Sequence, residues 1–202
     1  MNNWLKRIAF ASGLLCSATA LASPINITNG GFEAGQGNDI SGWFHEVGHQ
    51  VAYTTNQLIH NGTRYTAAEG NRFAVLPAHA SIRAETNWKV GDTISFKWLA
   101  LEAIDPTFQL FENGLIVTKS IDLTGATGTW HEFSYTFEDA VGQNNLPSFI
   151  GFQGFADNVY LDQSLLLVDD VKITRISVPA TFGLALLGLG YLVARQRLLS
   201  ST

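Results

Sequence analysis

The sequence lacks cysteine pairs, basic clusters and amphipathic helices, and each absence narrows what the protein can be. Its 202 residues include a single cysteine, Cys16, so no disulfide can form within one chain. Lysine and arginine number 12 against 17 aspartates and glutamates. The basic residues form no cluster, which argues against nucleic acid as a partner. Between the two chain ends no apolar stripe at helical spacing extends over a dozen residues, which argues against a helical domain.

The first 22 residues have the pattern of a secretory signal peptide. Lys6 and Arg7 precede an apolar segment, and Ala20-Leu21-Ala22 supplies the small residues that signal peptidase requires. We therefore predict export, with residues 1–22 removed. Their loss takes away two of the 12 basic residues, none of the 17 acidic residues and the cysteine, so the exported chain has a formal charge of −7. Such a domain depends for its stability on its core or on a bound metal.

The central part of the chain alternates apolar and polar residues with the period of two that β-strands require. Residues 93–98 and 132–137 show this alternation, and Leu167, Val171 and Ile173 share one parity. Turn signals rich in glycine and asparagine separate such segments and predict eight to ten short strands. We predict an all-β domain, a two-sheet antiparallel β-sandwich of the jelly-roll type.

Four short motifs, in order along the chain, carry a family resemblance. They are Asn29-Gly30-Gly31-Phe32-Glu33 with Ser41-Gly42-Trp43, Glu69 to Leu76, Trp130 to Phe137, and Leu167 to Ile173. On these motifs the predicted domain, residues 23–177, resembles jelly-roll carbohydrate-binding modules and the galactose-binding-like sandwiches related to them. The resemblance implies a non-catalytic domain that binds polysaccharide, here an extracellular exopolysaccharide. A structural matrix protein without a glycan ligand is the alternative.

Three carboxylates at the motif ends indicate a metal site. Asp169 shares the parity of apolar residues, so its carboxylate is expected to be buried and to need a partner. The resemblance implies that Glu33, Asp169 and Asp170 bind a structural calcium ion, which prefers such oxygen ligands. The alternative is that Glu33 and Asp169 accept backbone N–H hydrogen bonds without a metal.

Two aromatic residues are candidates for sugar stacking. Trp43, Trp98 and Trp130 occupy strand positions that fit core packing. Trp88, beside a Gly-Asp turn, and Tyr65, in a loop that starts at an Asn-Gly turn, are predicted to lie on an exposed face. Their rings would then stack on the apolar face of a sugar.

The segment His45-Glu46-Val47-Gly48-His49 matches the H-E-x-x-H pattern of zinc peptidases. In that pattern two histidines on one helix face bind zinc, and the glutamate is the general base. Glycines and β-branched residues in and around the segment favour a strand instead. In a strand the two histidines would lie about 13 Å apart, too far for one metal. We therefore predict no catalytic residues, with a zinc metallopeptidase as the alternative.

The C-terminal segment, residues 178–202, resembles the PEP-CTERM sorting signal of Gram-negative bacteria. Val178-Pro179-Ala180 keeps the first proline of that signal, but alanine replaces its glutamate and threonine its second proline. An apolar run follows, and Arg195 and Arg197 close it. The resemblance implies transient membrane association through a C-terminal helix, cleavage by an exosortase-like enzyme and release to the cell envelope or an extracellular biofilm matrix. An ordinary membrane anchor with its arginines in the cytoplasm is the alternative.

Overall fold

All secondary structure in the described part of the chain is β-strand. The computed structural model describes residues 22–25, 27–45, 50–102, 105–112, 116–123, 128–138, 148–155 and 164–176. Within these ranges it contains thirteen strands. Residues Pro24–Arg175 form one compact unit.

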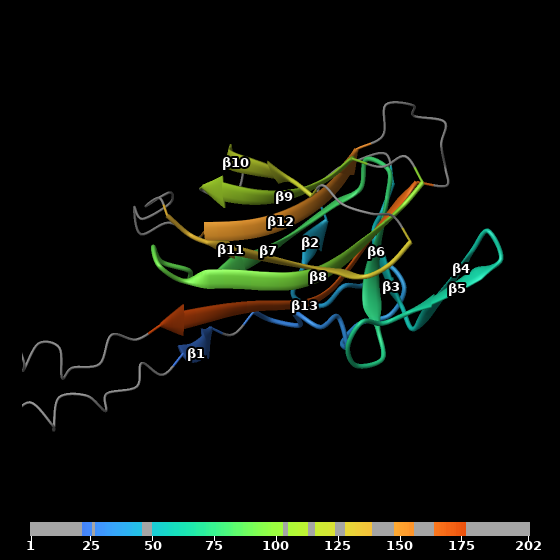
Figure 1. Cartoon of the computed structure of the whole chain (residues 1–202), viewed down its shortest axis with the longest axis horizontal. Helices are drawn as coiled ribbons and strands as arrows, with labels where there is room; N and C mark the ends of the chain where they lie inside the picture. The colour runs from blue at the N-terminus through green and yellow to red at the C-terminus, as the bar shows by residue number, and fades with distance from the viewer. Residues whose placement is uncertain are drawn as a thin grey trace, which may run out of the picture. The chain divides into compact units, whose positions relative to one another are not determined.

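One layer is a six-stranded antiparallel sheet (Figure 1). Along it the strands run in the order β11-β8-β13-β6-β3, and β1 pairs separately with β13. Its strands are β1 (Ala22–Ile25), β3 (Tyr53–Thr55), β6 (Phe73–Pro77), β8 (Thr93–Leu101), β11 (His131–Thr136) and β13 (Leu165–Ile176).

The second layer is a five-stranded antiparallel sheet in the order β10-β9-β12-β7-β2. Its strands are β2 (Phe44–His45), β7 (Ser81–Thr86), β9 (Asp105–Glu112), β10 (Ile116–Asp122) and β12 (Ser148–Phe155). The two layers confirm the predicted all-β sandwich, although the prediction of eight to ten strands was too low. The additional strands are very short. β2, for example, has only two residues, too few for an alternation of apolar and polar residues to be recognised.

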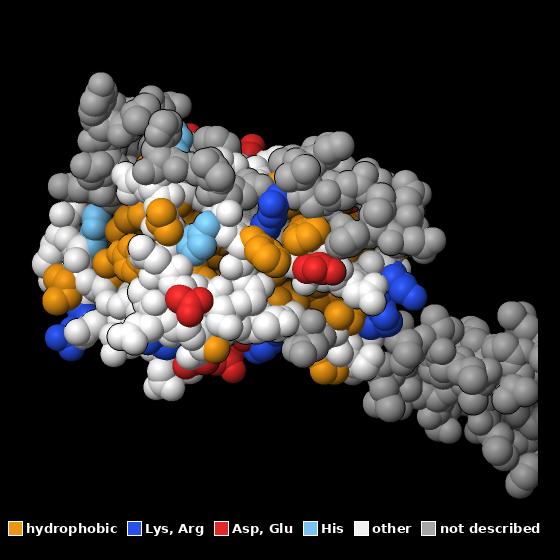
Figure 2. Space-filling model, turned by 180° about the vertical axis from the view of Figure 1, so that it is seen from behind, with side chains coloured by type: hydrophobic (Ala, Val, Ile, Leu, Met, Phe, Trp, Pro, Cys, Tyr) orange, Lys and Arg blue, Asp and Glu red, His pale blue; other side chains and the backbone are white. Residues whose placement is uncertain are grey.

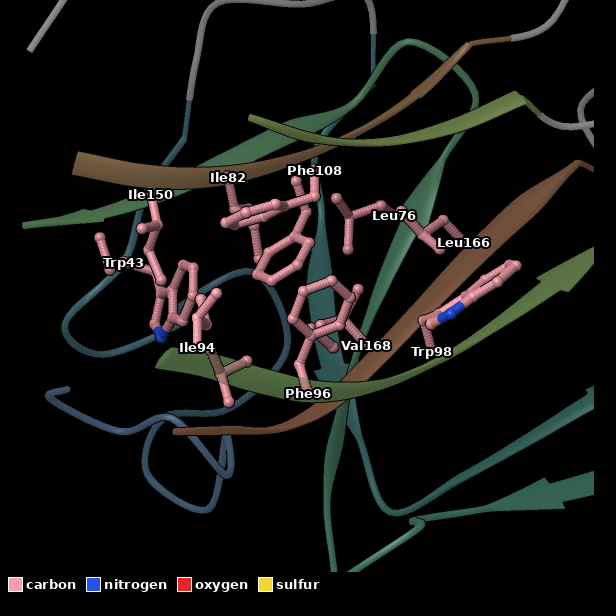
Figure 3. Close-up of a cluster of buried hydrophobic side chains, with 14 of the residues drawn as sticks. Trp43, Leu76, Ile82, Ile94, Phe96, Trp98, Phe108, Ile150, Leu166 and Val168 are labelled. Atoms are coloured by element: carbon pink, nitrogen blue, oxygen red, sulfur yellow. The ribbon is translucent and has the colours of Figure 1, made fainter. Parts of the chain in front are cut away.

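The main core lies between the two sheets (Figure 3). Strand alternation builds it, because Ile94, Phe96 and Trp98 on β8 all point inward and are at most 4% exposed. Figure 3 shows Ile94 and Phe96 facing Ile82, Phe108 and Ile150 of the opposite sheet, while Trp98 lies to one side, near Leu166. Phe96 and Phe152 contact edge to face, with their ring centroids 4.8 Å apart. The alternation predicted for residues 93–98 is therefore confirmed.

A second apolar cluster lies on the other face of the six-stranded sheet. It consists of Phe73, Val75, Leu99, Leu101, Leu165 and Leu167. A hairpin covers it, formed by β4 (Gln57–His60) and β5 (Thr63–Thr66), with Leu58 and Tyr65 packed against the cluster. The hairpin turns at Asn61-Gly62, where both residues have positive φ (48° and 78°), as a two-residue turn of this kind requires.

A β-bulge interrupts β13 between Asp169 and Lys172. Asp170 has a φ of 53°, and the shift places Val171 and Ile173 in the main core while Leu167 belongs to the second cluster. The expectation that these three apolar residues share one face was therefore wrong, because one extra residue reverses the alternation.

The Asn29-Gly30-Gly31-Phe32-Glu33 motif forms a tight loop held by one side chain. The Asn29 amide Nδ2 donates to the carbonyl oxygens of Ala34 and Ser41, both at 2.9 Å. The indole Nε1 of Trp43 donates to the Asn29 carbonyl at 3.1 Å. Gly30 is required because a Cβ there would lie 2.1 Å from the carbonyl oxygen of Val171. The loop thus locks the start of the domain onto β13.

Candidate functional site

Several hydrophobic side chains of the sandwich are exposed to solvent, and one of them is aromatic. Figure 2 shows hydrophobic side chains reaching the surface at several places on one side of the molecule. In the described part of the chain, the exposed large hydrophobic residues are Phe44, Val51, Ile59 and Val90. Phe44 is the aromatic one, is 54% exposed and belongs to a strand of the five-stranded sheet.

Phe44 lies on the outer face of that sheet, opposite to the main core. On β7 the inward residues are Ile82 and Ala84, so Arg83 and Glu85 point outward. The same reasoning applies to the neighbouring strands, where the core residues are Ile150 and Phe152 on β12 and Phe108 and Leu110 on β9. The outward residues of the three strands include Arg83, Glu85, Gln109, Phe111, Phe149, Gly151 and Gln153.

The strand register arranges these outward residues in rows across the sheet. One row contains Phe44, Arg83, Gly151 and Gln109, which are successive register partners. The next row contains Glu85, Phe149 and Phe111. The rows bring aromatic rings, a guanidinium and an amide to one face of the sheet, where Phe44 is exposed and Phe111 and Gln109 lie buried beside it, at 2% and 5% exposure.

Contacts within the outer face centre on Phe149. Its ring meets the ring of Phe44 edge to face at 6.2 Å, and the Arg83 guanidinium lies 5.5 Å from its centroid. The guanidinium also lies 6.0 Å from the centroid of Phe111. These contacts hold Arg83 between two aromatic rings and restrict where its N–H groups point.

Two amide side chains extend the polar part of this face. Nε2 of Gln109 donates a hydrogen bond to Oε1 of Gln153 at 2.9 Å. Gln109 is only 5% exposed although its side chain is outside the main core. Gly151 lies beside it, and a Cβ there would come 2.5 Å from Cε2 of Phe111, so glycine allows that ring to lie over the strand.

The sequence prediction did not identify this face. Its signal is the alternation in Ser81-Ile82-Arg83-Ala84-Glu85, where polar or charged residues occupy every second position. Phe111 and Phe149 hid the pattern, because an outward phenylalanine cannot be told from an inward one by periodicity alone.

Trp88 does not lie on an exposed face, so that prediction was wrong. It is 3% exposed and stacks on Phe137, with centroids 4.3 Å apart and planes 12° from parallel. The turn beside it folds back, since Gly91 N–H donates to the Phe137 carbonyl at 2.8 Å. The buried indole completes the end of the main core.

The other aromatic predictions have mixed outcomes. Trp43 and Trp98 are core residues, 6% and 4% exposed. Trp130 packs against the second cluster instead, where its Nε1 donates to the Thr66 carbonyl at 3.0 Å and helps to hold the hairpin. Tyr65 also packs there and in addition lines a cavity of about 290 Å³ at the end of the hairpin.

Asp169 is fully buried, as predicted, and backbone N–H groups satisfy its carboxylate. Oδ2 accepts hydrogen bonds from Ala68 N (2.8 Å) and Glu69 N (2.9 Å), and Oδ1 accepts one from Asp170 N (2.7 Å). Burial raises the pKa of Asp169 to about 6, against the lowering effect of these three bonds. The carboxylate clamps the segment before β6 onto the bulge of β13.

Glu33 holds the same segment a few residues further on. Its Oε1 accepts hydrogen bonds from Asn71 N (2.7 Å) and Arg72 N (3.1 Å). Gly70, with a φ of 65°, lets the backbone come this close, since a Cβ there would lie on the Glu33 carboxylate.

This arrangement matches the alternative without metal. Asp170 forms ion pairs with Lys172 (2.5 Å) and Lys97 (3.9 Å) instead of joining the other two carboxylates. Among the described residues no three His, Cys, Asp or Glu side chains gather as a metal-binding group. Calcium binding by Glu33, Asp169 and Asp170 therefore stays a prediction.

The described part of the H-E-x-x-H segment is strand. His45 is the last residue of β2 and makes a 2.8 Å hydrogen bond between its Nε2 and the carbonyl of Asn38. Residues 46–49, including His49, lie outside the described residues. The helix that a zinc peptidase would require at this motif does not begin at His45.

The predicted targeting segments lie almost wholly outside the described residues. Of the signal-peptide prediction only Ala22 is described, and the sorting-signal residues Val178, Pro179, Ala180, Arg195 and Arg197 are not. In the part of the chain that the structure describes, no helix is long and apolar enough to cross a membrane.

Comparison with known proteins places the fold. No family model matches the chain, and no curated protein matches it in sequence. The chain is similar to the carbohydrate-binding module TmCBM61, solved in complex with β-1,4-galactotriose, with a TM-score of 0.54 and 15% identity over 76% of this chain and 99% of the module. The fold is a jelly roll.

Two further solved structures share it. The CBM22-1 xylan-binding domain of Paenibacillus barcinonensis Xyn10C has a TM-score of 0.50 and 12% identity, covering 80% of this chain and 99% of that domain. The Stig cyclase Fisc of Fischerella sp. TAU has a TM-score of 0.52 and 14% identity, covering 76% of this chain and 98% of the cyclase. Since binding modules and a cyclase share the jelly roll, the function must be argued from this chain's own surface.

Proposed function

We propose that this domain binds polysaccharide, without catalysis, through the outer face of the five-stranded sheet. The observation that carries the proposal is the cluster of Phe44, Phe149 and Arg83 beside the Gln109–Gln153 pair. Similarity in fold to two carbohydrate-binding modules supports it.

The chemistry of this face matches that of a sugar chain. A pyranose has one apolar face of C–H groups, which stacks on an aromatic ring, and a rim of hydroxyls, which need hydrogen-bond partners. Phe44 offers an exposed ring, Arg83 brings a guanidinium to the same face, and the partly exposed amide of Gln153 carries both a donor and an acceptor. A strand face also presents such groups at regular intervals, which suits a repeating polymer.

We place this activity outside the cytoplasm. The signal-peptide pattern of residues 1–22 supports export through signal peptidase, and the C-terminal resemblance supports sorting by an exosortase-like enzyme. The ligand class that follows is an exopolysaccharide of the cell envelope or biofilm matrix. A face that carries aromatic, amide and guanidinium groups is suited to holding such a polymer.

Affinity electrophoresis against a panel of neutral, acidic and amino polysaccharides tests the proposal. We expect Phe44→Ala to weaken retention by about tenfold, the equivalent of one lost stacking contact. Val90→Ala is the matched control, since Val90 is 48% exposed and lies away from this face on the turn before β8. If the wild-type protein binds no glycan in the panel, a structural matrix role replaces this proposal.

A further inference from the structure

A cavity at the end of the β4–β5 hairpin lies on the other layer of the sandwich. Its volume is about 290 Å³, and its lining includes His60, Asn61, Thr63, Tyr65, Leu101 and Glu102. The hairpin supplies the first four residues, and the end of β8 supplies the others. None of these residues belongs to the outer face of the five-stranded sheet.

One wall of the cavity is polar and preorganised. Glu102 has a φ of 58°, a conformation that is uncommon outside glycine and asparagine and that follows directly on the end of β8. Its Oε1 accepts a hydrogen bond from Asn61 Nδ2 at 2.7 Å and lies 3.3 Å from His60 Nε2. Within the described part of the chain no hydrogen bond engages Oε2, the second oxygen of this carboxylate.

The other wall is apolar and rigid. Leu101 is 4% exposed and belongs to the second cluster, and Tyr65 packs against that cluster from the hairpin. An aromatic ring fixed by packing presents its face at low entropic cost. The two walls together offer stacking on one side and hydrogen-bond acceptors on the other.

We infer that this cavity is a second sugar site, which takes a single neutral hexose ring. The ring stacks on Tyr65, behind which Leu101 is buried, while its hydroxyls donate to Oε2 of Glu102 and exchange hydrogen bonds with Asn61 and Thr63. The volume lies at the small end of ligand sites, which suits one ring of a chain end or branch and not a polymer segment.

The charge of the cavity restricts its ligand further. A uronic acid would place its carboxylate against that of Glu102 and is rejected by like-charge repulsion. Of the described lining residues, His60 and Glu102 are the His, Cys, Asp or Glu side chains, which is fewer than the three that a metal site usually needs.

If the proposed function holds, the domain has two sugar sites, one on each layer of the sandwich. One domain that holds a polymer on the five-stranded sheet and a chain end at the hairpin links two polysaccharide molecules. Each weak site then acts at the local concentration set by the other.

Methyl glycosides of neutral hexoses, titrated into the full chain and followed by NMR chemical shifts, test the cavity directly. We expect shifts at residues 60–65 and 101–102, and about tenfold weaker binding in Glu102→Gln, which removes the charged acceptor but keeps the size of the side chain. Tyr65→Phe keeps the ring packed and should retain stacking. Arg64→Gln is the control, because Arg64 is an exposed hairpin residue outside the cavity lining.

The outcomes separate this inference from the proposed function. Absent shifts at the hairpin, equal binding by Glu102→Gln, or equal binding of methyl glucuronide overturns the second site. Loss of polysaccharide retention in Phe44→Ala with unchanged glycoside binding supports both sites. If the wild type fails to bind polysaccharide but a neutral glycoside still shifts the hairpin residues, the proposed function is wrong and the second site stands.

Discussion

Asp169→Ala tests whether the buried carboxylate holds the segment before β6 without a metal. The substitution removes the acceptor for the N–H groups of Ala68, Glu69 and Asp170. A buried donor left without a partner costs about 1–3 kcal/mol. We take the lower end of this range, about 1 kcal/mol for each donor, because Glu69 is exposed and water can reach its N–H. The three donors together then give a loss of about 3 kcal/mol.

That loss is large against the total stability of a single domain, about 5–15 kcal/mol. For about 150 ordered residues it corresponds to a melting temperature lower by about 6–12 °C. Asp169→Asn keeps one acceptor oxygen and turns an amide N–H₂ toward a backbone donor, so we expect an intermediate loss. Glu33→Gln retains an oxygen that can accept from Asn71 and Arg72, and should change stability least of the three.

Thermal unfolding followed by circular dichroism, in calcium and in chelator, is the assay. The N–H clamp predicts the same order of variants and the same differences in both solutions. Melting of Asp169→Ala within 1 °C of the wild type in chelator would refute the clamp. A calcium-dependent rise that Asp169→Ala abolishes would instead support the calcium site that the resemblance implies.

Three further predictions concern pH, packing and processing. Burial raises the pKa of Asp169 to about 6 from 3.8, so between these values the native state keeps a proton that the unfolded state has lost. The proton-linked part of the stability, which is separate from the hydrogen bonds of the clamp, is therefore full below pH 4 and lost as the pH rises through 6. Denaturant midpoints of the wild type should fall over this range relative to those of Asp169→Asn, measured from about pH 4 to 7. Gly151→Ala brings a Cβ to 2.5 Å from Phe111 and 2.9 Å from the Ile82 carbonyl, so we expect a loss of about 1–3 kcal/mol in urea unfolding, and an unchanged midpoint would mean that the Phe111 ring moves freely. Intact-mass analysis of the extracellular fraction should find a chain without residues 1–22 and without Arg195 and Arg197, whereas a full-length C-terminus retained in the inner membrane would support the plain anchor.

Strands with one buried face could be predicted from the sequence. In residues 93–98 the polar positions stay in partial contact with solvent, so the alternation survives and Ile94, Phe96 and Trp98 are recognisable as core. The core residues of β6 could not be recognised by alternation, because the hairpin covers the second face of this strand and all five of its residues are buried. Periodicity disappears where both faces of a sheet are covered.

The candidate sites were harder to predict, for two physical reasons. Trp88 was expected at the surface because it adjoins a turn, but the turn folds onto Phe137 and the ring closes the core. Phe149 and Arg83 become neighbours only through the pairing of β12 with β7, and a single sequence does not contain this register. The burial of Asp169 was predictable because a carboxylate among apolar residues implies partners, although the identity of those partners was not.

The bulge in β13 divides one strand between two tasks. Before it, odd-numbered positions face the hairpin side, where Leu167 serves the hairpin cluster and Asp169 fastens the preceding segment, while Leu166 and Val168 fill the main core. After it, the odd-numbered Val171 and Ile173 fill the main core. Deleting a single residue at Asp170 would turn every following side chain to the opposite side, placing apolar groups in water and polar ones in the interior. This stretch therefore tolerates a change of side chain far better than an insertion or a deletion. The number of residues in the bulge determines the fold as much as the identity of those residues does.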